Sequence, residues 1–134
     1  MKKIALLFLV FTVHFGFAQN SKVKVPTIVF KVPLGETIVK DGVSIMLSEV
    51  LEDSRCPSDV DCVWAGKSKV EVVIDYNGKK TTEIILFQKG RQKVIANTEN
   101  TVFKAVSLSP YPTSTTQGKL KYELLVMEEI KIEE

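Results

Sequence analysis

An alternating stretch at residues 69–87, KVEVVIDYNGKKTTEIILF, constrains the fold more than any other part of this chain. Apolar or aromatic side chains fill every second position before its centre, at Val70, Val72, Ile74 and Tyr76. A similar spacing returns afterwards at Thr82, Ile84 and Leu86. A period of two is that of a β-strand, and Asn77-Gly78 between two such runs indicates a two-residue turn. The stretch therefore predicts an antiparallel hairpin.

A second hairpin is predicted in the segment ETIVKDGVSIML, where two apolar runs flank Asp41-Gly42. In its second half, one face is formed by Val43, Ile45 and Leu47. The next apolar residues are Val50 and Leu51, so the alternation slips by one position. Such a slip predicts a β-bulge near Ser48-Glu49.

Further strands are expected over residues 22–32, 101–109 and 119–132, and residues 94–96 form either a short strand or a loop. Pro26 favours an edge position or a break in the first of these. The last has one face formed by Leu120, Tyr122, Leu124 and Val126. No segment shows a convincing helical period. We therefore predict an all-β fold, an antiparallel β-sandwich or small barrel of about seven to eight strands with one short-loop disulfide. A meander and a Greek key both remain open.

The N-terminus is typical of a secretory signal peptide. Lys2-Lys3 precedes a mostly apolar run over residues 4–17, and the small residues Gly16 and Ala18 lie at its end. A transmembrane helix needs about 20 apolar residues, which is more than this run supplies. We expect residues 1–18 to be a signal peptide that is removed on export to the periplasm or the extracellular space.

The mature chain is then expected to be a single β domain over residues 19–134. It loses Lys2 and Lys3, so the 18 basic side chains become 16 and balance the 16 acidic ones. A neutral surface does not attract nucleic acid by long-range electrostatics. No cysteine precedes Cys56, so we expect no lipid anchor and no stable membrane anchor after cleavage.

The only histidine, His14, belongs to the predicted signal peptide. Without it, the mature chain has no imidazole base for a Ser-His-Asp or Cys-His nucleophile. Its two cysteines alone do not complete a four-ligand zinc site. We therefore expect no enzymatic activity and no cofactor.

The segment EDSRCPSDVDCVWAG, residues 52–66, holds both cysteines and the only tryptophan. An oxidising compartment predicts a disulfide between Cys56 and Cys62. Trp64 is two residues past Cys62 and on an extended chain would share its face, so we interpret the indole as packing over the disulfide. Val60 is expected to point inward.

The acidic residues of this segment allow two interpretations. Glu52, Asp53, Asp59 and Asp61 carry oxygen atoms that suit calcium, although EF-hand spacing is absent. The alternative, which we prefer, pairs Asp53 with Arg55 and leaves Asp59 and Asp61 solvated or capping a turn.

The same segment resembles a family of uncharacterised secreted proteins and lipoproteins of bacteria. The shared motif is Asp-Ser-Arg-Cys-Pro, four residues, Cys, any residue, Trp-Ala-Gly. Its fixed positions here are Asp53, Ser54, Arg55, Cys56, Pro57, Cys62, Trp64, Ala65 and Gly66. The resemblance implies export but no particular activity. Many members look lipid-anchored, and this chain departs from them in that respect.

Two other surfaces are candidates for contact with a partner. Tyr111 lies between Pro110 and Pro112 and is a candidate binding residue, together with Trp64, although a prolyl turn with the ring lying on the sheet is the simpler interpretation. Residues 84–87 are apolar on both faces, which favours a central strand. At an edge, the same segment would be a candidate for strand addition or self-association.

The sequence thus predicts an exported, non-enzymatic binding or cell-envelope accessory module, whose partner is an unknown protein or carbohydrate. One alternative is a calcium-stabilised module built on the four carboxylates. Another, from a different class, is a small inhibitor or hydrolase.

Overall fold

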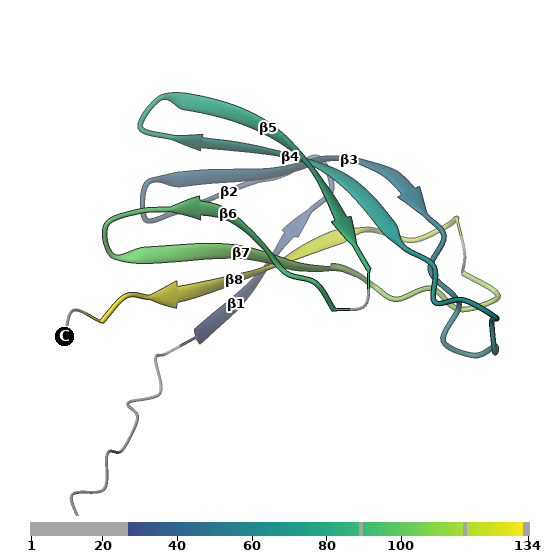
Figure 1. Cartoon of the computed structure of the whole chain (residues 1–134). Helices are drawn as coiled ribbons and strands as arrows, with labels where there is room; N and C mark the ends of the chain where they lie inside the picture. Colours follow the sequence, from purple (N-terminus) through teal and green to yellow (C-terminus); the bar gives the residue numbers. More distant parts are fainter. Residues whose placement is uncertain (1–26, 89, 117, 133–134) are drawn as a thin grey trace, which may run out of the picture.

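Eight antiparallel strands form two four-stranded sheets that face each other as an open sandwich (Figure 1). The computed structural model describes residues 27–88, 90–116 and 118–132. The strands are β1 (Thr27–Pro33), β2 (Thr37–Lys40), β3 (Val43–Asp53), β4 (Ser68–Tyr76), β5 (Lys79–Phe87), β6 (Lys93–Asn97), β7 (Thr101–Ser109) and β8 (Glu123–Ile130). The predicted all-β sandwich is confirmed, whereas the predicted signal peptide and Pro26 lie outside the described residues.

The strand order answers how the strands are connected, where the sequence left both a meander and a Greek key open. One sheet has the order β2-β3-β4-β5 and is a simple meander. The other has the order β1-β8-β7-β6, so the first described strand pairs with the last. Among the described residues there is no helix long and apolar enough to cross a membrane.

Both predicted hairpin turns are confirmed, because their residues adopt the left-handed backbone that a two-residue turn requires. Asp41 and Gly42 have φ values of 47° and 75°, and Asn77 and Gly78 have values of 53° and 76°. The predicted bulge is also present, since the register of β3 against β4 shifts between Leu47 and Glu49.

The position and face of β5 differ from the sequence prediction. This strand lies at the edge of its sheet and not at the centre, and its outward Ile84 and Leu86 are 53% and 45% exposed. The core-facing residues are instead Ile85 and Phe87. The turn sets this choice, because it pairs Val70 with Ile85 and so places both on the inner face.

The core lies between the sheets and is built mainly from alternate residues of β3, β4, β7 and β8, including Ile45, Leu47, Val72, Phe103 and Leu124. The last strand is shorter than predicted, because it begins at Glu123 and leaves residues 120–122 outside it. Of these, Tyr122 contacts Asp53 at the end of β3, where the connection to β4 begins. This connection carries the sequence motif and emerges at one end of the sandwich (Figure 1).

Candidate functional site

The motif leaves β3 and returns to β4 as two arms that run side by side. The amide of Ser54 donates to the carbonyl of Lys67 at 2.8 Å, and the amide of Cys56 donates to the carbonyl of Ala65 at 3.2 Å. These bonds continue the β3–β4 pairing beyond the strands themselves. The residues between the arms project as a loop.

Gly66 allows the two arms to approach. Its φ is +69°, and a Cβ built there would lie 2.7 Å from the carbonyl carbon of Ser54 and closer still to the carbonyl oxygen. No other residue type fits this position without moving the backbone. The motif glycine is therefore required by the close approach of the two arms.

Asp53 and Arg55 form a buried ion pair under the motif, as the preferred interpretation predicted. Nε and Nη2 of the arginine each lie 2.7 Å from a carboxylate oxygen, and both side chains are 8% exposed. The hydroxyl of Tyr122 donates to the same carboxylate at 3.0 Å. The Arg55 guanidinium and the Tyr122 hydroxyl together fix the orientation of the carboxylate.

Burial and the neighbouring side chains shift the pKa of Asp53 in opposite directions. Burial raises the pKa of Asp53, but the hydrogen bonds and charge of Arg55, together with the Tyr122 hydroxyl, lower it more. The net pKa is below the ordinary aspartate value. Conversely, burial and the adjacent Asp53 raise the pKa of Tyr122. Asp53 therefore carries a charge whose compensation depends on Arg55.

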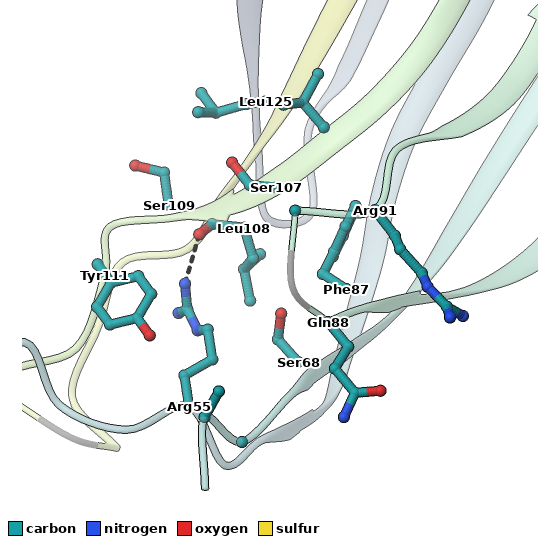
Figure 2. Close-up of a pocket in the computed structure, with 14 residues that line it drawn as sticks. Arg55, Ser68, Phe87, Gln88, Arg91, Ser107, Leu108, Ser109, Tyr111 and Leu125 are labelled. Atoms are coloured by element: carbon teal, nitrogen blue, oxygen red, sulfur yellow. Dashed lines mark hydrogen bonds between the residues drawn. The ribbon is translucent and has the colours of Figure 1, made fainter. Parts of the chain in front are cut away.

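Arg55 also ties the motif to the opposite sheet. Its Nη1 donates to the carbonyl of Leu108 at 2.6 Å, and its Nη2 donates to the carbonyl of Pro110 at 3.1 Å (Figure 2 shows the first bond). The ring of Tyr111 lies 4.9 Å from the guanidinium carbon, within range of a cation–π contact. Tyr111 stays 52% exposed, so its ring packs on Arg55 and not down on the sheet.

The predicted disulfide is present between Cys56 and Cys62, with 6.0 Å between their Cα atoms. The loop that it closes is docked on the segment after Pro110. The amide of Ser58 donates to the carbonyl of Pro112 at 2.9 Å. Asp59 accepts hydrogen bonds from the Ser114 amide at 2.7 Å and the Ser114 hydroxyl at 2.5 Å, and the hydroxyl contact leads in lowering the pKa of Asp59.

The interpretation of Trp64 as a lid on the disulfide is wrong. The indole is 74% exposed, and the preceding Val63 is 96% exposed. Val60, expected to point inward, is also exposed. The Cys56 amide holds the carbonyl of Ala65, the residue after Trp64, and in this position the indole faces solvent. Trp64 and Tyr111 line one shallow hollow together with the disulfide. Because both are exposed there, both remain candidate binding residues.

The four carboxylates proposed for calcium do not converge. Glu52 contacts Ser54 and Lys67, Asp53 is held by Arg55, and Asp59 is held by Ser114, while Asp61 is exposed. In the part of the chain that the structure describes, no group of three His, Cys, Asp or Glu side chains is placed to hold a metal ion. The four carboxylates therefore do not form a calcium site in the described part of the chain.

A pocket of about 420 Å³ lies beside Arg55, where the segment after β5 passes the end of β7 (Figure 2). Its walls come from both sheets and the motif. Two of its residues, Ser68 and Arg91, were not predicted from the sequence. Ser68 had a detectable signal, because it is the polar first member of the inward series that continues with Val70 and Val72.

No protein-family model, curated protein sequence or solved structure was found that matches this chain. The resemblance carried by the motif therefore stays a prediction, and the functional argument rests on the geometry of the molecule.

Proposed function

We propose that the protein is an exported, non-enzymatic binding module that contacts a protein or a carbohydrate of the cell envelope through its disulfide loop, residues 56–64. The observation that carries the proposal is the exposure of two adjacent apolar side chains, Val63 and Trp64, on this loop. An isolated exposed apolar residue is common, but an exposed tryptophan on a restrained loop is typical of a binding anchor.

The loop is held at several points, which favours binding. The disulfide closes it, Asp59 attaches it to Ser114, and the arms at Gly66 fix its exit. A restrained loop loses less conformational entropy when it meets a partner than a free one does. An indole face also suits both partner classes, because it can stack on a sugar ring or fill a protein pocket.

Export and the absence of enzymatic activity are part of the same proposal. The signal-like N-terminus and the disulfide are both typical of oxidising compartments. Loss of His14 on processing removes the commonest general base. The balanced charge of the mature chain argues against nucleic acid as the partner.

Trp64 is the only tryptophan, so its fluorescence reports directly on this loop. Mature protein carrying 7-azatryptophan at position 64, excited where ordinary tryptophan does not absorb, would be titrated with soluble peptidoglycan fragments in one arm and with detergent-solubilised envelope proteins in the other, with detergent alone as the blank. We expect a saturable blue shift of the emission in one arm, because a partner removes water from the indole. No shift in either arm would contradict the proposal.

A matched pair of variants separates the loop from general surface hydrophobicity. Val63→Ala shortens the exposed side chain beside Trp64, whereas Val39→Ala does the same on β2, where Val39 is also exposed. The proposal expects weaker binding to the responding fraction for Val63→Ala only. Equal effects of the two variants would contradict it.

A further inference from the structure

The pocket beside Arg55 has the construction of a small-molecule site. β6 pairs with β7 only as far as Ala105, so residues 106–109 have no strand partner on that side among the described residues. The pocket fills this gap, and its apolar walls include Phe87, Leu108 and Leu125 (Figure 2). Its volume of about 420 Å³ lies in the range of pockets that hold small organic ligands.

Ser68 supplies an unpaired polar group at this pocket. It occupies an inward position of β4 and is 0% exposed, yet its Oγ has no hydrogen-bond partner among the described residues. In Figure 2 its hydroxyl points into the space between Arg55 and Phe87. A buried hydroxyl without a partner is costly, and such groups in native proteins call for a specific explanation. Because Ser68 is 0% exposed, neighbouring side chains must shift before a ligand oxygen reaches this hydroxyl, and that contact would then satisfy it.

The charge of the pocket indicates the sign of the ligand. The chain has two arginines, Arg55 and Arg91, and both line this pocket although they are far apart in the sequence. None of its described lining residues is acidic, but Asp53 lies against Arg55 and balances its charge, so the net positive charge of the lining comes from Arg91. Arg91 lines the pocket beyond Phe87, with its guanidinium directed away from Arg55 and Ser68 in Figure 2, and it has no ion-pair partner among the described residues. Its charge therefore favours an anion at the mouth.

Arg55 offers a further donor even though it is paired with Asp53. Its hydrogen bonds to Asp53, Leu108 and Pro110 engage Nε, both N–H groups of Nη2 and one N–H of Nη1. One N–H of Nη1 thus has no acceptor within the described part of the chain. With Ser68, it makes two donors available to the oxygens of one acid group.

We propose that this pocket binds a small carboxylate with an apolar body. The carboxylate oxygens accept hydrogen bonds from Ser68 Oγ and Arg55 Nη1, the apolar body lies against Phe87 and Leu108, and Arg91 attracts the anion. Trp64 does not line this pocket, so the inference goes beyond the proposed loop function and does not rest on it.

The test uses octanoate as the probe and octanamide as its neutral counterpart, with binding followed by isothermal titration calorimetry and by backbone amide NMR shifts. We expect octanoate to bind more tightly than octanamide and to move the amide signals of Ser68 and Leu108. Ser68→Ala should weaken octanoate binding about tenfold, as expected for one hydrogen bond to a charged group. Ser44→Ala on β3, outside the pocket, should leave it unchanged.

Arg91→Gln provides a second variant at an exposed position where folding is not at risk. It should weaken octanoate binding and reduce its dependence on salt concentration, while octanamide binding is unaffected. Equal binding of octanoate and octanamide, or wild-type affinity in Ser68→Ala, would overturn the proposal. So would the absence of any octanoate response up to its solubility limit. Trp64→Ala should bind octanoate as the wild type does, which separates this result from failure of the loop proposal.

Discussion

Replacement of Arg55 by methionine should strongly destabilise the protein, because it leaves the buried carboxylate of Asp53 without its charged partner. The two side chains are each 8% exposed and meet at 2.7 Å. Removing one partner of a buried ion pair costs about 3–5 kcal/mol. The carbonyls of Leu108 and Pro110 would also lose their donor. We expect the free energy of unfolding to fall by about 3 kcal/mol or more, a large part of the 5–15 kcal/mol typical of a domain.

The sign of the pH dependence makes this prediction specific. In the wild type, burial raises the pKa of Asp53 but Arg55 and Tyr122 lower it further, to below the ordinary value. A lowered folded-state pKa contributes stability above the ordinary carboxyl pKa, and that contribution is lost as the pH falls through the folded value. In Arg55→Met, burial is no longer outweighed, so the folded-state pKa rises above the ordinary value and the charged form is penalised. The penalty is then largest at neutral pH and shrinks on acidification.

Urea denaturation at pH 7 and near pH 4 measures both effects. The stability difference between wild type and Arg55→Met should narrow at the lower pH. The double variant Asp53→Asn/Arg55→Met should recover part of the loss at pH 7, because it removes the unpaired charge. Arg91→Met serves as the control and should change stability by less than about 0.5 kcal/mol, since Arg91 is exposed. A difference that is independent of pH, or no recovery in the double variant, would refute the reasoning.

Three further predictions concern the same end of the sandwich. Replacing both cysteines by serine should lower the free energy of unfolding by roughly 2–2.5 kcal/mol, the value expected for so short a loop. The circular dichroism of the strands should not change. An unchanged melting temperature would exclude a stabilising disulfide. Gly66→Ala should lower the free energy of unfolding, measured by urea denaturation, clearly more than Gly42→Ala does. Both glycines have a positive φ, but of the two only Gly66 has backbone atoms, those of Ser54, within contact distance of an added Cβ. Equal losses of stability would mean that the backbone shifts at little cost to relieve the contact with Ser54. Tyr122→Phe removes a hydrogen bond to Asp53 and should therefore raise the pKa of Asp53, which an NMR titration measures. It should also lower the free energy of unfolding by about 1 kcal/mol. An unchanged pKa of Asp53 would show that this hydrogen bond is weak.

Local pattern was sufficient for the parts of the fold that are decided within a few residues. The turns at Asp41-Gly42 and Asn77-Gly78 and the bulge at Ser48 follow from backbone preference and alternation alone. The inward face of β5 was also predictable, because a two-residue turn pairs Val70 with Ile85. Alternation alone, without that pairing, favoured Ile84 and Leu86 as the returning series.

The candidate site was predicted only in part. The Asp53–Arg55 pair and the disulfide follow from proximity in sequence, and both are present. The exposure of Trp64 was missed, because an apolar side chain near a disulfide is usually buried, and only the three-dimensional path of the loop shows that this indole stays exposed.

The sequence by itself determined the β class, the two turns, the bulge and the chemistry of the motif, since each depends on φ preference, period or short-range pairing. The tertiary structure alone decided that β5 lies at an edge, that Asp59 meets Ser114, and that Ser68 and the two arginines line one pocket. Those relations join residues far apart in the chain. They arise from how two sheets pack over a shared core, a geometry that no local pattern encodes.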